Sequence, residues 1–242
     1  MAAKTKNKPT FSIIIPVLNE ARTINSLIEH LHTLHSNGIC EIIVVDGSPE
    51  QNTVRAIKYN DIIAISAPKG RGRQMNAGAA IARGDILIFL HADTQLPHNA
   101  LNSIDQFLEE NKFVGGAFDL GIKSHKLSLK IIAFGANFRT HFTHIPYGDQ
   151  AIFIRRDYFN KIGGYKDIPV MEDIELMHRI KRLGGKIRIL SDRVVTSPRR
   201  WEKEGVVYCT LRNWALSLLF FLDIPSQKLE KFFKQGKDAY NR

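Results

Sequence analysis

The chain has 242 residues, of which 44% are hydrophobic, so it can bury a substantial core without a disulfide or a structural metal. Its formal net charge of +10 suits nucleic acid, an acidic membrane surface or a phosphorylated small molecule, and does not choose among them. The two cysteines, Cys40 and Cys209, lack metal-ligand spacing, which argues against a zinc site or a disulfide framework and fits a reducing cytosol.

The N-terminal segment MAAKTKNKPT carries lysines, but only a strand-length apolar run follows it. A secretory signal needs a longer apolar region. We therefore expect residues 1–10 to form a loose tail.

Apolar runs alternate with helical periodicity from residue 11 onward. Strands are expected at 11–15, 41–45, 62–66 and 86–90, and a helix follows the first strand from Ile24 until Gly38 stops the pattern. Strands that alternate with helices predict right-handed βαβ units, and so an α/β fold with a mostly parallel sheet. Further strands are expected at 114–120 and 151–154, and a helix from about Asp173 to Leu183.

Polar or charged residues follow the expected strands. In ILIFLHADT, a run that reads as a strand buried on both faces stops at His91 and Asp93. The first strand leads through Pro16 to Glu20, and the second ends at Asp46. Asp46 alone could cap a helix or shape a turn, but ligands bind beyond the carboxyl ends of such strands. The joint placement of these groups predicts a site at that edge.

The loop PKGRGRQMNAG follows the third strand and opens a helix. Gly70 and Gly72 resemble half of a dinucleotide fingerprint, but Met75 stands in place of the third glycine and no P-loop pattern is present. Cations and glycines at a helix N-terminus suit a diphosphate, and the alternative is a flexible surface turn.

Two motifs in the second half of the chain have both a structural and a functional interpretation. YGDQ is a tight glycine turn with a surface Asp149, or part of a site before a strand. MED places Glu172 and Asp173 at the start of a helix, where an aspartate commonly serves as the N-cap.

The motif SPRRW sets Arg199 and Arg200 beside Trp201. We interpret it as a clamp for a diphosphate or an acceptor in a late loop. The alternative is exposed charge beside a packed indole.

Six stretches together resemble the family-2 glycosyltransferases in their order and approximate spacing, over roughly Phe11 to Trp201. They are SIIIPVLNEARTI, EIIVVDGS, GRGRQMNAGAAIARGDILIFLHADT, YGDQAIFIRRDYFNKIGGY, MEDIELMHRIKRLGGKI and SPRRW. Within that family the chain looks closest to small bacterial transferases associated with arsenosugar biosynthesis, which share the HADT and RRW forms. The resemblance implies a GT-A fold, a nucleotide-sugar donor such as a UDP- or GDP-sugar, a divalent cation and inversion at the anomeric carbon.

The resemblance makes Asp93 the candidate metal ligand. The family commonly has two aspartates here, whereas this chain has His91 in the place of the first. Mn²⁺ tolerates imidazole while Mg²⁺ favours oxygen ligands. Either His91 joins a Mn²⁺ site, or Asp93 and the donor phosphates hold Mn²⁺ or Mg²⁺ with water, and we favour the second.

The resemblance also implies roles for the other motif residues. Asp173 is expected to be the general base that takes the acceptor proton, and Glu172 to orient the acceptor or the donor. The expected donor contacts are Pro16, Glu20, Asp46, Arg71, Asn76, Asp93, Arg199 and Arg200, and the expected acceptor contacts are Asp149, Gln150, Glu172 and Trp201.

We expect a GT-A domain at 11–205 and a helical appendage at 206–242. The uncharged run 213–222 is about half of the ~20 residues needed to span a bilayer. The helical spacing of Leu211, Trp214 and Leu218 allows docking on the domain, a homodimer contact, or contact with lipid through Lys228, Lys231 and Lys234. Docking or dimerisation is favoured, and the expected location is the cytoplasm, with peripheral contact at the inner face of the membrane as the alternative.

Two rival function classes stay open. A basic nucleic-acid-binding module would explain the charge but not the carboxylates at successive strand ends, so no nucleic acid partner is expected. A nucleotidyltransferase of similar fold would use the same nucleotide pocket and metal but release pyrophosphate.

Overall fold

The structure is a computed structural model that describes residues 11–34, 40–110, 112–222 and 224–231. The described residues do not include the predicted tail at 1–10 or Gly38, where the first helix was expected to stop. They also do not include residues 232–242 of the predicted appendage, among them Lys234. The strands are β1 (Phe11–Val17), β2 (Cys40–Asp46), β3 (Ile63–Ser66), β4 (Ile86–Phe89), β5 (Thr94–Gln95), β6 (Gly115–Ile122), β7 (Phe153–Arg155) and β8 (Ile187–Thr196). The helices are α1 (Ile24–His32), α2 (Asn52–Arg55), α3 (Arg71–Ile81), α4 (Ala100–Leu108), α5 (Leu127–Thr143), the 3₁₀ turn η1 (Gly148–Gln150), α6 (Arg156–Lys161), α7 (Glu172–Arg182), α8 (Arg199–Glu204) and α9 (Val206–Phe221).

The described strands form one sheet in the order β3-β2-β1-β4-β7-β6-β8-β5. The first four are mutually parallel, and β6 is parallel to β8. Only β7 and β5 run against their neighbours. The predicted α/β fold with a mostly parallel sheet is confirmed, and the carboxyl ends of β1 to β4 meet at one edge.

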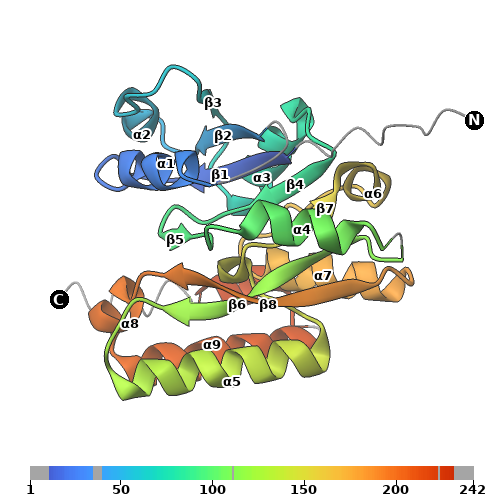
Figure 1. Ribbon diagram of the computed structural model, residues 1–242. Helices are drawn as coiled ribbons and strands as arrows, with labels where there is room; N and C mark the ends of the chain where they lie inside the picture. Colours follow the sequence, from blue (N-terminus) through green and yellow to red (C-terminus); the bar gives the residue numbers. More distant parts are fainter. Residues whose placement is uncertain (1–10, 35–39, 111, 223, 232–242) are drawn as a thin grey trace, which may run out of the picture.

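Helices cover both faces of the sheet, because the central strands are apolar on both. Ile13 and Ile15 of β1 pack with α1 and α4, whereas Ile14 packs on the other face with α3 and α7. Figure 1 shows α1 and α4 along one side of the twisted sheet. The result is a three-layer core that holds the carboxyl edge rigidly.

Several boundaries differ from the expected ones. β1 continues to Val17, so Pro16 lies inside the strand and pairs with Val45. α1 ends at His32, before the last apolar residue of the periodic pattern. Arg199 and Arg200 open the helix α8, so the prediction of a late loop was wrong there. Helices α4 and α5 and strand β8 were not predicted.

Beyond the central layers, α5 and α9 lie side by side below β6 and β8 (Figure 1). Leu129, Trp201 and Cys209 join α5, α8 and α9 in a small apolar cluster of their own. The start of the predicted appendage therefore packs as a helix on the domain. Among the described residues, every helix is too short or too polar to cross a membrane.

Candidate active site

Asp46, at the carboxyl end of β2, is fully buried. Its Oδ1 accepts a hydrogen bond from the amide of Ser48 (2.8 Å), and its Oδ2 accepts from the amides of Thr53 (3.1 Å) and Val54 (3.4 Å). This carboxylate shapes the loop that follows β2, in agreement with the alternative that Asp46 shapes a turn. A direct contact between Asp46 and a nucleotide stays a prediction.

That loop forms one wall of a pocket of about 320 Å³ at the ends of β2 and β3. The pocket lies just beyond the carboxyl edge, where open α/β sheets bind ligands. Its lining residues are Gly47, Ser48, Pro49, Gln51, Ser66, Ala67, Pro68 and Lys69.

Gln74 of α3 ties this edge together and was missed by the sequence analysis. Its Nε2 donates to the carbonyl oxygens of Val17 and Val45, each at 2.8 Å, and its side chain is buried. A β-carbon on Gly47 would lie only 2.8 Å from the Gln74 side chain. The position of Gln74 in the sequence could have revealed this role, because it is a polar residue on the same face of α3 as Met75 and Gly78, which faces the sheet.

Two predicted donor contacts on α3 have partners within the protein. The Asn76 Nδ2 donates to the carbonyl of Tyr165 (2.8 Å), and its Oδ1 accepts from the Tyr165 amide (2.9 Å). Arg71 opens α3, keeps half of its side chain exposed, and reaches Glu172 with 3.7 Å between Nη1 and Oε1. Asn76 therefore fixes the backbone at Tyr165, whereas the half-exposed Arg71 can contact a ligand while it is paired with Glu172.

Glu20, Asp93 and Arg199 form a second charged group at the same edge. The Arg199 guanidinium donates to both carboxylate oxygens of Glu20, at 2.7 and 3.3 Å. Its Nη2 lies 4.0 Å from Oδ2 of Asp93. Burial raises the pKa of Asp93, and the positive charge of Arg199 opposes that rise. Residues that are far apart in the sequence thus share one cluster.

His91 and Asp173 approach each other across Gly148. A β-carbon on Gly148 would lie 2.9 Å from the His91 Nε2 and 3.4 Å from the Asp173 Oδ2. The Gly148 amide donates to that oxygen at 2.6 Å, and the Ile174 amide donates to Oδ1 at 2.8 Å. Burial and the nearby Arg71 and Arg200 lower the pKa of His91 to about 3, so its imidazole is neutral.

Asp173 is not the N-cap of its helix. Met171 occupies that position with a left-handed backbone (φ 66°), and Asp173 lies in the first turn of α7. The structural interpretation of this residue as a cap is wrong, and its half-buried carboxylate lies beside η1.

Asp149 lies in η1 among several charges. Burial raises its pKa to about 6, Arg139 opposes this rise, and Asp173 and Asp93 add to it. Its neighbour Gln150 is buried, where its Nε2 donates to the Phe118 carbonyl (3.0 Å) and its Oε1 accepts from Thr140 (2.9 Å). Gln150 therefore fixes η1, whereas Asp149 belongs to the charged cluster.

Arg139 of α5 was missed. Its guanidinium lies 3.4 Å from the ring centroid of Tyr147 and acts on the Asp149 charge. The available signal was a cation within a long apolar helix, which needs a reason to face inward.

Glu172 is almost fully buried, so its carboxylate acts through Arg71 rather than on a ligand of its own. Burial raises its pKa to about 7, and the Arg71 charge opposes this rise. Arg200 also belongs to the cluster, because its positive charge acts on both His91 and Asp149. Trp201 packs against Leu129 and Cys209, which favours a structural role for its indole.

Asp93 fits a hard divalent cation, since its carboxylate is one-third exposed at the end of β4. Among the described residues, no three histidine, cysteine or acidic side chains gather as a ligand set. An ion held by Asp93 would take its remaining ligands from donor phosphates and water. A neutral His91 imidazole is chemically able to bind Mn²⁺ as well.

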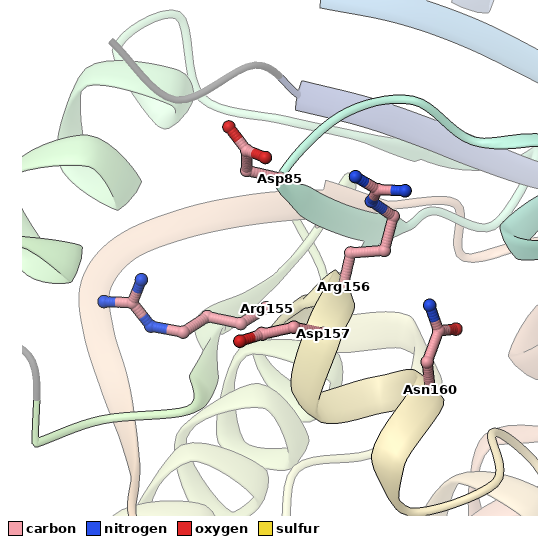
Figure 2. Close-up of a pocket in the computed structure, with 5 residues that line it drawn as sticks. All are labelled: Asp85, Arg155, Arg156, Asp157 and Asn160. Atoms are coloured by element: carbon pink, nitrogen blue, oxygen red, sulfur yellow. The ribbon is translucent and has the colours of Figure 1, made fainter. Parts of the chain in front are cut away.

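A second pocket, of about 450 Å³, lies at the opposite edge of the sheet (Figure 2). Asp85 precedes β4, and Arg155 ends the antiparallel β7 beside it, so both lie far from the carboxyl ends of β1 to β4. None of the predicted site residues lines this pocket. The structure instead gathers His91, Asp93, Asp149, Asp173, Arg71 and Arg200 at the carboxyl edge.

Comparison with known proteins gives a family. The model described as "Glycosyl transferase family 2" matches residues 12–163. An uncharacterized glycosyltransferase of Haemophilus influenzae is 26% identical over 185 residues, which cover 75% of this chain and 58% of that protein. The chain thus spans less than two thirds of this relative, and 30% of glucosyl-3-phosphoglycerate synthases from mycobacteria. These relatives carry names of other glycosyltransferases, so a link to arsenosugar biosynthesis gains no support.

Solved structures share the GT-A fold. A mannosyltransferase from Pyrobaculum calidifontis, in complex with GDP-Man and Mn²⁺, has a TM-score of 0.61 at 17% identity and covers 78% of this chain and 57% of its own. Staphylococcus aureus TarS 1-349, in complex with UDP-GlcNAc, has a TM-score of 0.59 at 19% identity and covers 78% of this chain and 58% of its own. The expected fold is therefore confirmed.

Proposed function

The chain belongs to glycosyl transferase family 2 and is a glycosyltransferase, and from this premise we propose that it moves a sugar from a nucleoside-diphosphate sugar to an acceptor hydroxyl with inversion at the anomeric carbon. The observation that carries the proposal is the convergence of Asp93, Asp149 and Asp173 with Arg71 and Arg200 at the edge that holds the 320 Å³ pocket. The nucleotide pocket, the arginines for the phosphates and the candidate general base, Asp173, thus lie along one edge of the sheet.

We place the base of the nucleotide in the pocket at the ends of β2 and β3. Gly47, Ser48, Pro49 and Gln51 of the loop after Asp46 line it, and Asp46 acts by holding that loop. Lys69 lines the same pocket and leads directly to Arg71 at the start of α3. A diphosphate beside this helix start would meet both the cations and the free amides of the first turn. The donor is a UDP- or GDP-sugar, the two classes named for the bound structural neighbours.

Asp173 is the proposed general base. Backbone amides of Gly148 and Ile174 hold one hydrogen bond to each of its oxygens, which fixes the carboxylate and leaves lone pairs for an acceptor hydroxyl. The acceptor oxygen would lose its proton to Asp173 and form a bond to the anomeric carbon. The bond from that carbon to the phosphate oxygen would break, and the nucleoside diphosphate would leave with the electron pair.

Charge on the departing diphosphate needs positive partners. Arg71, Arg199 and Arg200 are placed to supply them, with Glu172 orienting Arg71 and Glu20 orienting Arg199. A divalent cation held by Asp93 would add charge stabilisation without proton transfer. Mn²⁺ or Mg²⁺ would serve, and water would complete its ligands.

Donor binding and product analysis test the proposal. UDP-, GDP- and dTDP-sugars should be compared by thermal shift in the presence of Mn²⁺. We expect one nucleotide class to stabilise the protein, and slow hydrolysis of that donor to release nucleoside diphosphate and free sugar. Release of pyrophosphate would instead identify a nucleotidyltransferase, and salt-sensitive DNA binding without nucleotide stabilisation would favour a nucleic-acid-binding module.

A further inference from the structure

Helices α5 and α9 expose a large apolar surface that the proposed reaction does not use. On α5, the exposed residues Leu127, Ile131, Phe134, Phe138 and Phe142 recur at helical spacing, and residue Phe142 is 82% exposed. These residues and the exposed apolar residues of α9 together form what we call the two-helix face. Scattered exposed apolar residues are normal, but an unbroken stripe of this length marks an interaction surface.

The second stripe runs along α9. Leu211, Trp214, Leu218 and Phe221 are exposed there, and the Trp214 residue is 65% exposed. The opposite side of α9 buries Cys209, Arg212, Leu216 and Ser217 against the domain. The exposed apolar residues are therefore not needed to pack α9 on the domain.

Helices α5 and α9 of the two-helix face run side by side in the same direction. At their starts, Lys126 lies 3.8 Å from Glu202, and Leu129 packs on Trp201 and Cys209. At their far ends, the Tyr147 hydroxyl lies 2.7 Å from the Ser217 Oγ. Figure 1 shows α5 and α9 side by side along the lower side of the molecule. A helix of this length is about 25 Å long, so the two stripes form an elongated, shallow surface.

Positive charges predominate around this surface, where Glu202 lies beside Lys126. From Leu120 to Gly148, and again from Gly205 to Leu222, the sequence contains no aspartate or glutamate. Lys123, Lys126 and Lys130 are exposed at the start of α5. Aromatic and aliphatic side chains flanked by lysines are typical of helices that lie in an anionic membrane interface.

We propose that the two-helix face docks on an anionic membrane surface, with α5 and α9 lying in the interfacial plane. A second copy of the chain is a weaker occupant, because a two-fold contact would bring the exposed Lys123, Lys126 and Lys130 of each copy together, and Glu202 beside Lys126 can offset only part of that charge. A bilayer with anionic headgroups supplies both the apolar layer and the opposite charge. None of the described helices can cross the bilayer, and this form of binding requires no crossing.

Docking would also place the acceptor side of the site beside the membrane, a step that rests on the proposed function. The segment with Asp149 is tied to α5 through the hydrogen bond from Thr140 to Gln150, and to α9 through Tyr147 and Ser217. These two hydrogen bonds thus connect the two-helix face directly to the proposed acceptor side.

Trp214 provides an intrinsic probe, since the chain has two tryptophans and the other, Trp201, is buried. Full-length protein should be mixed with vesicles of phosphatidylcholine alone or with 30% phosphatidylglycerol. We expect co-sedimentation and a blue shift of tryptophan emission with the anionic vesicles only. Binding is measured without donor, and donor binding without vesicles, so failure of this proposal is distinct from failure of the proposed function.

Variants separate the membrane from other occupants. We expect Phe134→Gln/Phe138→Gln/Trp214→Gln to lower the vesicle partition coefficient at least tenfold, while the matched control Ile81→Gln/Leu183→Gln leaves it unchanged. Lys126→Gln/Lys130→Gln should lower it by about fivefold per lysine, and Lys58→Gln/Lys161→Gln should lower it less. Absence of vesicle binding, or equal binding by the triple variant and its control, would overturn the proposal. So would a wild-type dimer in light scattering that the triple variant dissolves, if neither binds vesicles.

Discussion

On the proposed donor side of the sheet edge, Asp46, Gln74 and Asn76 give their hydrogen-bonding capacity to backbone groups, whereas on the proposed acceptor side Asp149 and Asp173 lie within a cluster of mixed charges. On the donor side, buried side chains hold the loops in place, and the residues of those loops line the pocket. The acceptor side brings ionisable groups from separate segments close to one another. If the proposed roles hold, recognition of the donor requires side chains that hold loops in place, whereas the transfer chemistry requires ionisable side chains close to one another.

The sharpest way to separate the two sides is Asp173→Asn. This change keeps the shape of the side chain and removes its proton affinity, so we expect kcat to fall by about 10² to 10⁴ while the donor dissociation constant changes only a few-fold. Turnover, or donor hydrolysis where no acceptor is known, measures the first effect, and calorimetry measures the second. Near-normal transfer by this variant, with activity lost instead in Asp149→Asn or Glu172→Gln, would assign the base elsewhere.

The metal is the next test, because Asp93 lies where the two sides meet. We expect Asp93→Ala to abolish the Mn²⁺-dependent part of the thermal stabilisation by nucleoside diphosphate, and His91→Ala to weaken it less. The reason is that Asp93 offers a charged oxygen ligand, whereas the neutral His91 imidazole is not needed if water completes the site. Equal losses in the two variants would make His91 a ligand.

Asp46→Asn probes the donor frame. The amide cannot accept all three backbone hydrogen bonds, so we expect a loss of about 2–3 kcal/mol in the free energy of unfolding together with weaker nucleotide binding. Urea unfolding and thermal shift with nucleoside diphosphate measure the two effects. The exposed Asp61, paired with His32, is the matched control, and Asp61→Asn should change stability by less than about 0.5 kcal/mol. Unchanged stability in Asp46→Asn would contradict the assigned role.

The acceptor cluster should show a pH dependence of stability. The raised pKa of Asp149, about 6, means that the folded state retains a proton that the unfolded state has lost, in the window from about pH 4 to pH 6. Stability is therefore expected to fall as pH rises through this window, by on the order of 1–2 kcal/mol. Asp149→Asn should remove that part of the fall in urea unfolding at pH 4.5 and 7.5. An identical pH dependence in the variant would contradict the burial of this carboxyl group.

Two glycines give the smallest effects and have opposite signs. Gly148→Ala would press a methyl group against His91 and Asp173, so we expect kcat to fall roughly tenfold as the base is displaced. Gly135 of α5 has no atom within 4 Å of its β-carbon position, so Gly135→Ala should stabilise the protein by about 0.5–1 kcal/mol and leave kcat unchanged. Kinetics and thermal unfolding of both variants test the difference. Unchanged turnover in Gly148→Ala would mean that the close approach across Gly148 does not position the base.

Local patterns in the sequence determined much of this protein. The apolar runs predicted β1 to β4, the helical spacing predicted the helix that becomes α7, and the polar residues behind the strand runs marked Asp93. Asp173 was singled out only through the resemblance of its motif to the family. Such signals are local, since burial on both faces demands consecutive apolar residues and a ligand edge demands polar ones directly after them. The order of motifs added the family and hence the GT-A fold.

Only the tertiary structure decided what these side chains face. Glu20 and Arg199 are 179 residues apart in the chain and become partners only because β8 and β5 return beside each other at the end of the sheet. Trp201 packs in the apolar cluster with Leu129 and Cys209. Gln74 binds the Val17 carbonyl, and Arg139 stacks on Tyr147, contacts that the sequence did not reveal. On α5, apolar residues occur around most of the helix, so periodicity alone could not tell the stripe that packs on β6 from the stripe left exposed. That choice depends on which face the sheet covers, which is a property of the assembled chain.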